Sequence, residues 1–249
     1  MDLIQALAAE LGKDPRHVEN VVHLLDEGNT IPFIARYRKE LHGAMDDTSL
    51  RTLEERLQYL RGLEERREAV KKSIDEQGKL TDELAAAIDS AKTLAEVEDL
   101  YRPYKQKRRT RATMAKEKGL EPLAALLFAQ ERDCPRPEEA ARDFVDPEKG
   151  VETVEDALQG ASDIIAEQIS DDAAIRKSLR ALISRQGQLV SRAATEDDSV
   201  YRLYYDFTQS VARLQGHQVL AINRGEKEGI LKVSITLDRE QALPLLRRA

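Results

Sequence analysis

A stripe of apolar residues at spacings of three and four constrains this sequence more than any other feature. The stripe lies within residues 47–78, and its members are Leu50, Leu53, Leu57, Leu60, Leu63, Val70 and Ile74. This spacing predicts one face of an α-helix, although Arg67 interrupts it. The helix is expected to begin at Asp47 or Thr48 and to end at Gly78, a length on the order of 45 Å. So long a helix predicts an elongated scaffold, in which it packs as a spine on the chain's other helices rather than on a coiled-coil partner.

Helix caps and prolines predict shorter helices around this spine. Three are expected before it, at residues 2–12, 14–28 and 31–40, and two after it, starting at Thr81 and Thr93. Thr93 and Glu96 have the spacing of a capping box. Pro103 is expected to end that helix, because proline lacks an amide donor and disfavours helix at the preceding residue. Residues 110–131 then predict two helices around Gly119, similar to a helix-turn-helix, with a shared apolar face made of Met114, Leu120 and Leu127.

The second half of the chain contains the strand candidates. Its clearest break is the segment 133–150, which has three prolines and a short expected helix at 138–145. Thr153 and Ser170 are expected to cap two helices whose short connection predicts an antiparallel hairpin. Beyond the hairpin, the sequence predicts a strand or extended arm at 188–194, an aromatic helix at 199–207, a helix at 211–223, a β-branched strand at 230–237 and a final helix from 239 onward.

These elements predict a mainly α fold class: an elongated multi-helix scaffold with one spine helix, a helix-turn-helix-like pair and a minor β element near the C-terminus. Aromatic residues are only 4% of the chain and charged residues 34%, which fits a lean core and an extended surface. Three regions are expected: 1–132, with the spine and the helix-turn-helix-like part; 133–190, the hairpin; and 191–249, the aromatic helix, the strand and a link toward a further domain. The last helix has no capping glycine, as expected of a protein cut before another domain.

A block of positive charge follows Tyr101. Residues 101–118 contain eight basic residues and one acid, Glu117, so the block carries +7 in a chain whose net charge is −7. Such a block predicts a local polyanion-binding edge, because the acidic remainder argues against nucleic-acid binding by the chain as a whole. The candidate contacts are Arg102, Lys105, Lys107, Arg108, Arg109 and Arg111. The alternative is a solvated connector whose charges pair with an acidic neighbour.

Two nearby features favour structural roles. The helix expected at 121–131 would be the one to enter a DNA groove, but its first turns lack Arg, Lys and Asn, and its acids would repel phosphate. We therefore interpret the helical pair as structural or partner-binding. Arg36, Arg38 and Lys39 form a small basic cluster beside Tyr37. We interpret this cluster as a solvated helix end favoured by the helix dipole.

No motif indicates catalysis, so the chain is not expected to be an enzyme. The four histidines are scattered, and no metal-binding, dinucleotide-binding or phosphate-loop motif is present, so neither a metal nor a cofactor is expected. The acid pairs at 46–47 and 197–198 are interpreted as caps or turns. The single cysteine, Cys134, fits a reducing cytoplasm. The start of the chain does not have the pattern of a signal peptide, and no apolar run is long enough to cross a membrane.

Three long stretches resemble the N-terminal region of the bacterial Tex family of transcription accessory proteins. They are EDLYRPYKQKRRTRATMAKEKGLEPLA at 98–124, IPFIARYRKELHGAMDDTSLRTLEERLQYL at 31–60 and VLAINRGEKEGIL at 219–231. The resemblance implies a largely helical, cytoplasmic, nucleic-acid-binding protein that acts in transcription. It also implies that residues 110–130 are the helix-turn-helix-like part, and that 219–231 lead toward an RNase H-like domain. That domain, a helix-hairpin-helix region and an S1 domain of OB fold have no counterpart in this sequence.

Two hypotheses follow for the function. In the first, the chain is the scaffold of a nucleic-acid-binding protein and contacts single-stranded RNA or DNA weakly, without sequence preference, through the basic edge. About five phosphate contacts would give a slope of roughly −3.5 for log affinity against log salt. In the second, the chain is a protein-interaction scaffold that docks other domains or the transcription machinery, such as RNA polymerase, and has no nucleic-acid affinity of its own. Neither hypothesis involves a membrane.

Overall fold

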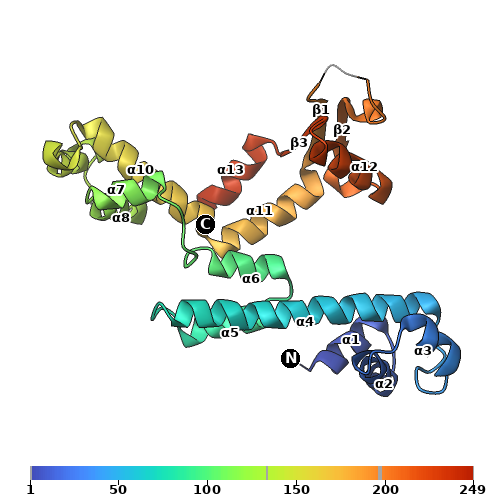
Figure 1. Ribbon diagram of the computed structural model, residues 1–249. Coiled ribbons are helices and arrows are strands. Elements are labelled where there is room, and N and C mark those ends of the chain that lie inside the picture. The colour runs from blue at the N-terminus through green and yellow to red at the C-terminus, as the bar shows by residue number, and fades with distance from the viewer. Residues whose placement is uncertain (1, 133, 196–197, 249) are drawn as a thin grey trace. The chain divides into compact units, whose positions relative to one another are not determined.

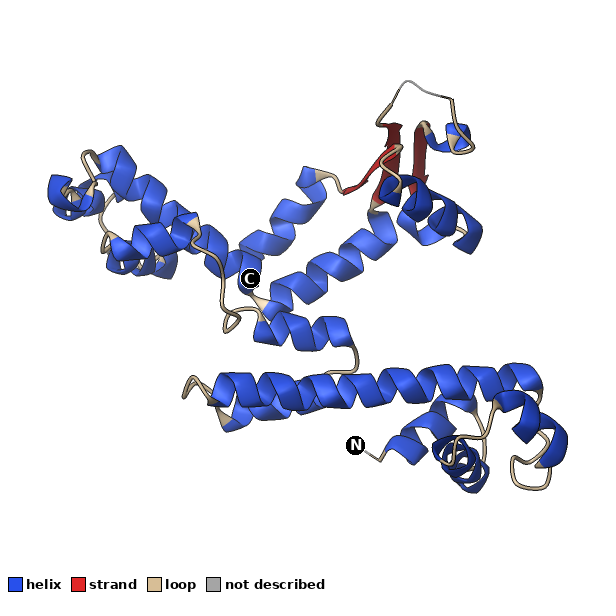
Figure 2. Ribbon diagram, in the orientation of Figure 1, coloured by secondary structure: helices blue, strands red, loops and turns tan. Residues whose placement is uncertain are grey.

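The computed structural model describes residues 2–132, 134–195 and 198–248. The chain forms two compact units, Met1–Tyr101 and Arg102–Ala249. Helices dominate both units, and the three strands found in the described residues all belong to the second (Figure 2). The mainly α fold class with a minor β element near the C-terminus is therefore confirmed.

The spine of the first unit is α4 (Asp47–Asp75), a helix of 29 residues. Asp46 caps it, with its carboxylate accepting a hydrogen bond from the backbone N–H of Ser49 at 2.7 Å. All seven apolar residues of the predicted stripe are buried, which confirms the spine. Helices α1–α3 and α5–α6 pack on α4, as Figure 1 shows. Their bounds are α1 (Leu3–Leu11), α2 (Pro15–Asp26), α3 (Ile31–Tyr37), α5 (Asp82–Ser90) and α6 (Leu94–Tyr101).

Arg67, which interrupts the apolar stripe in sequence, is itself buried at 2% exposure. Its guanidinium donates to the carboxylate of Glu64 at 2.7 Å and to the carbonyl of Ala91 at 2.5 Å. Ala91 directly follows α5, so the buried arginine ties α4 to the end of that helix. The prediction for residues 31–40 was too long, since α3 ends at Tyr37 and a turn follows.

The second unit begins with a small helical core. Helices α7 (Arg111–Glu117), α8 (Glu121–Ala129) and α9 (Pro137–Ala141) pack on α10 (Val154–Asp171). The predicted turn at Gly119 is confirmed by its positive φ of 83°. The predicted face was only partly right, because Met114 is 39% exposed while Ala112 and Ala115 face the core. The small residues allow close approach: a methyl group at Gly160 of α10 would overlap the side chain of Leu120.

Helix α10 begins at the predicted cap Thr153, which forms a capping box with Asp156. The next helix, α11 (Ala173–Gln186), is capped by Asp172 rather than by Ser170. It packs on α13 (Arg239–Arg248) and on the 3₁₀ turn η4 (Val211–Arg213), whereas α10 packs on α7 and α8. This arrangement differs from the predicted antiparallel hairpin, because each of the two helices covers its apolar face with a different partner.

A three-stranded antiparallel sheet completes the second unit, in the order β2-β1-β3. The strands are β1 (Gln188–Ala193), β2 (Asp206–Ser210) and β3 (Leu231–Thr236). The central strand pairs with both neighbours, so the predicted 230–237 strand has its partner in this chain. The aromatic helix predicted at 199–207 was wrong: a 3₁₀ turn, η3 (Arg202–Tyr204), leads into β2, because edge pairing with β1 satisfies that backbone. Helix α12 (Gly216–Lys227) packs on β3.

The compact units do not follow the three predicted regions, 1–132, 133–190 and 191–249. The first unit ends at Tyr101, and α7 and α8 pack on α10 within the second unit. The regions rest on breaks in the sequence pattern and the units rest on packing, so the three-region division stays a prediction. The acid pair predicted as a turn at 197–198 lies partly outside the described residues.

Candidate nucleic-acid interface

The predicted basic edge is the connector between α6 and α7. Helix α6 ends at Tyr101, two residues before Pro103, as predicted. Thr110 then caps α7 by accepting a hydrogen bond from the N–H of Thr113 at 3.0 Å. Between these points the chain forms turns and irregular backbone, with no regular helix or strand. The proline break therefore places the cations on a surface segment.

Two of the six candidate residues are held by carboxylates of α10. The Nε of Arg102 donates to Oδ1 of Asp171 at 2.9 Å, and Nζ of Lys107 donates to Oδ2 of the same residue. Lys107 also lies 3.4 Å from the carboxylate of Glu167. The side chain of Asp171 is only 11% exposed, so these pairs are better shielded from solvent than ordinary surface ion pairs. Arg102 and Lys107 thus bind the connector to α10 at two points.

A third candidate, Arg109, has a carboxylate partner of a different kind. Its guanidinium lies 2.7 Å from the carboxylate of Glu117 on α7, and both side chains are more than half exposed. An exposed pair of this kind contributes little and is easily exchanged for another anion. Farther along the block, Lys116 pairs with Glu121 and Lys118 donates to the carbonyl of Gly150.

The other three candidates are Lys105, Arg108 and Arg111. All three are exposed, and within residues 2–132, 134–195 and 198–248 none of them forms an ion pair. Three of the six candidates therefore fit a connector whose charges pair with acidic neighbours, and three have the exposure that a polyanion-binding edge requires. Three cations are paired with acids of the same unit, and three remain open to solvent.

Sequence reasoning missed the two acids that hold the connector. Glu167 and Asp171 are four residues apart on α10, so both lie on one face of that helix. Acids in the last turn of a helix oppose its dipole and need a compensating cation. That conflict was visible in the sequence. The cation that compensates these acids could not be identified from the sequence, because Lys107 lies 64 residues before Asp171 in the chain.

Helix α8 does not have the surface of a DNA-reading helix. Glu121 occupies its first turn, Leu123 and Ala124 are buried, and its exposed large side chains include Phe128 at 50%. Reading of base edges requires donors that this helix does not have along its length. The geometry thus agrees with a structural or partner-binding role for the α7–α8 pair.

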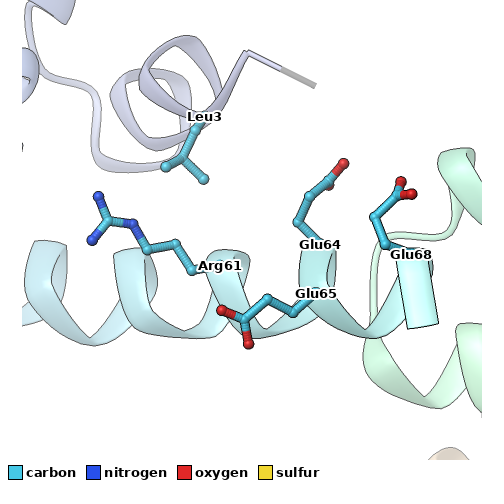
Figure 3. Close-up of a pocket in the computed structure, with 5 residues that line it drawn as sticks. All are labelled: Leu3, Arg61, Glu64, Glu65 and Glu68. Atoms are coloured by element: carbon cyan, nitrogen blue, oxygen red, sulfur yellow. The ribbon is translucent and has the colours of Figure 1, made fainter.

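A hollow in the first unit has the wrong charge for a polyanion. It lies between α1 and α4, has a volume of about 590 Å³ and is lined by Leu3, Arg61, Glu64, Glu65 and Glu68 (Figure 3). Its one cation, Arg61, is already bound by Asp26 at 2.7 Å. No group of three His, Cys, Asp or Glu side chains suited to a metal occurs in the described part of the chain. None of the helices described there is long and apolar enough to span a bilayer.

Two family models match the chain. Tex-like protein N-terminal domain matches residues 1–75, and Tex central region-like matches residues 133–247. Protein YhgF of Escherichia coli is 48% identical over 235 residues, and Transcriptional accessory protein Tex of Neisseria gonorrhoeae is 43% identical over 240 residues. S1 RNA-binding domain-containing protein 1 of Homo sapiens is 30% identical over 247 residues.

The alignments cover 93%, 94% and 95% of this chain, in that order. They cover 30%, 31% and 24% of the three relatives. The chain therefore spans less than a third of the length of the relatives it matches.

Proposed function

The chain belongs to the Tex family, and from this premise we propose that it is the N-terminal helical scaffold of a Tex-like transcription accessory protein that binds nucleic acid. In this proposal the connector makes a weak, sequence-nonspecific contact with the phosphates of single-stranded RNA or DNA. Lys105, Arg108 and Arg111 make the contact, and Arg109 joins them by leaving Glu117. The role is non-catalytic, requires no cofactor and belongs to the cytoplasm.

The observation that supports this proposal most is the set of three unpaired cations on one exposed segment. Lys105, Arg108 and Arg111 lie within a stretch of seven residues, the first two on irregular backbone and Arg111 at the start of α7. An unpaired surface cation can bind a phosphate without first breaking an ion pair. Contact with phosphates carries no sequence information, so binding through this segment alone would be nonspecific.

The number of free cations sets the expected salt dependence. Each phosphate contact with a single strand contributes about −0.7 to the slope of log affinity against log salt. The three cations without an ion pair therefore predict that the connector contributes about −2 to this slope, less than the −3.5 or so expected for five contacts. Affinity should be measurable at low salt and should weaken only modestly toward physiological salt.

The test is a salt-titrated binding assay with labelled single-stranded RNA and DNA. Changing Lys105, Arg108 and Arg111 together to Ala should remove the connector's contribution to the affinity and to the salt slope. Changing Arg108, Arg109 and Arg111 together to Ala should have the same effect. The matched control changes three exposed, unpaired cations of the first unit, Lys72, Lys79 and Lys92, to Ala. If the connector variants bind as the wild type does, or if the control loses as much affinity, the phosphate contact is not at the connector.

The second candidate is a scaffold for protein contacts, and the ion pairs with α10 favour it. Arg102 and Lys107 are already neutralised by Asp171 and Glu167, which is how a connector would be built if its role were to fix the fold. Under this alternative the chain docks other domains or the transcription machinery, such as RNA polymerase. It then has no affinity for oligonucleotides at any salt concentration, and it co-purifies with a partner that high salt releases.

A further inference from the structure

The outward face of α3 carries two aromatic rings and two guanidinium groups in contact. The rings of Phe33 and Tyr37 have centroids 5.3 Å apart, with their planes tilted by 47°. The guanidinium of Arg36 lies 5.9 Å from the centroid of Tyr37, and that of Arg38 lies 5.4 Å from the centroid of Phe33. We call these four residues, together with Lys39, the α3 cluster. Each ring is thus already placed beside a cation.

The cluster is exposed although its rings are large. Ile31 and Ile34 bury the inner face of α3 at 3% and 0% exposure, while Phe33 and Tyr37 are 36% and 57% exposed. Phe33 and Tyr37 are four residues apart, so both point to the same side of the helix. Large aromatic side chains are the residues whose burial stabilises most, and an exposed pair of them indicates a surface that is covered by a partner.

The cluster also keeps its positive charge. None of Arg36, Arg38 and Lys39 has an ion pair to any of the residues that the structure describes, and Glu40 is the one acid among residues 31–45. The side chain of Arg38 donates only to the carbonyl of Tyr37, at 3.4 Å. The sequence suggested a solvated helix end favoured by the dipole. That reading accounts for Arg36 but not for the rings, and α3 ends before Arg38 and Lys39.

Exposed rings beside free cations match the chemistry of single-stranded nucleic acid. Such strands offer a flat base that stacks on an aromatic side chain and a phosphate that binds an Arg or Lys. Guanidinium groups also stack on bases and on rings. An acidic peptide would satisfy the three cations but would provide no flat group for the rings. The cluster has both parts, in a chain whose net charge is −7.

We propose that the α3 cluster is a stacking site for single-stranded nucleic acid, in which a base packs on Tyr37 and Phe33 while phosphates bind Arg36, Arg38 and Lys39. This site lies in the unit Met1–Tyr101 and shares no residue with the connector. The site goes beyond the function proposed above and is tested by different variants.

The experiment uses the whole chain and two probes: a labelled oligouridine and heparin, a polyanion without bases. The stacking variant changes Phe33 and Tyr37 to Leu, which keeps apolar bulk and removes the rings. It should lose at least about fivefold in affinity for oligouridine and keep its affinity for heparin. The charge variant changes Arg36, Arg38 and Lys39 to Gln, and it should weaken binding to both probes and make the oligouridine salt slope shallower by about 2.

Two controls keep the test decisive. Phe128→Leu removes a ring that is 50% exposed and has no guanidinium beside it, and it should leave oligouridine binding unchanged. Tyr37→Phe keeps the ring, so with Phe33 intact it should bind oligouridine as the wild type does. This result would separate the loss of stacking from damage to the fold. If the stacking variant binds oligouridine as the wild type does, or loses heparin equally, the proposal is overturned. Poly-glutamate, an acidic peptide, serves as a further comparison. If the stacking variant loses affinity for poly-glutamate more than for oligouridine, the proposal is overturned in favour of a protein partner. The connector variants decide the earlier proposal independently.

Discussion

The Nε of Arg102 lies 2.9 Å from Oδ1 of Asp171, a residue 69 positions later in the chain. Lys107 binds the other oxygen of the same carboxylate. One largely buried acid at the end of α10 therefore holds the connector at two points, with Lys105 between them. The ion pairs that fix the connector and the cations that remain free on it are neighbours in sequence, so a polyanion bound at the connector would compete with Asp171 for Arg102 and Lys107.

Changing Asp171 to Asn together with Glu167 to Gln tests this competition. The variant releases Arg102 and Lys107, which raises the number of available cations from three to five. The connector's contribution to the salt slope for single-stranded RNA should then steepen from about −2 to roughly −3.5, and affinity at low salt should rise. Trypsin should also cut the connector faster, because it is no longer fastened to α10. The control is Asp163→Asn on the same helix, whose carboxylate accepts a hydrogen bond from Gln159 and binds no cation. An unchanged slope in the double variant would show that Asp171 does not hold cations back from phosphate.

The spine could be predicted from sequence because its signal is local and repeated. Seven apolar side chains at helical spacing specify a buried face in any context, and all seven are buried. The aromatic segment at 199–207 was wrong for the opposite reason. Its spacing of three and four also suits a helix, and only pairing of Asp206–Ser210 with β1 decides for a strand. Pairing between strands that are distant in the chain cannot be predicted from the sequence of either segment alone.

The candidate site was predictable in position but not in its pairing. Proline and charge placed the connector correctly, because both act locally. Which cations stay free depends on α10, whose Asp171 lies 64 residues beyond Lys107 in the chain. The α3 cluster was visible as residue types, but the helix end and the ring contacts that make it a surface are tertiary facts.

Gly160→Ala should destabilise the second unit. A Cβ there would overlap the δ-methyl group of Leu120, which is 2% exposed and has no room to move aside. Overpacking of this kind costs about 1–3 kcal/mol. The matched control is Gly62→Ala in α4, where nothing lies within 4 Å of the added methyl group. That change should stabilise by about 0.5–1 kcal/mol, since Ala favours a helix interior over Gly. Urea unfolding of both variants gives the comparison, and equal effects would argue against close packing of α10 on Leu120.

Arg67→Ala should destabilise the first unit more than Arg67→Met does. Both changes leave the carbonyl of Ala91 without the hydrogen bond it receives at 2.5 Å, a loss of roughly 1–3 kcal/mol. Alanine also leaves a cavity in place of the buried aliphatic part of the Arg67 side chain, whereas methionine fills most of that space. Glu64 is about half exposed, so neither variant leaves a buried unpaired charge. Thermal and urea unfolding would rank the two, and equal stability would show that this aliphatic part contributes little to packing.

The ion pairs of α4 with the first two helices predict how stability changes with acidity. Glu10 binds Arg56, and Asp26 binds Arg61, each through a pair of hydrogen bonds of 2.7–3.0 Å. The hydrogen bonds to the guanidinium groups lower the pKa of both carboxyls in the folded state. A lowered pKa means that these pairs stabilise the fold above the unfolded value of about 4, and that this contribution is lost as the pH falls through the folded pKa.

The double variant Glu10→Gln, Asp26→Asn isolates this effect. It should be less stable than the wild type at pH 7, and the gap in unfolding free energy should close as the pH is lowered below 4, because the wild-type carboxylates become neutral as well. Both acids are more than a third exposed, so added salt should also narrow the gap at pH 7. Urea unfolding from pH 7 to pH 3 measures it. A gap that stays constant with pH would mean that the side-chain charges of Glu10 and Asp26 do not hold α1 and α2 to the spine.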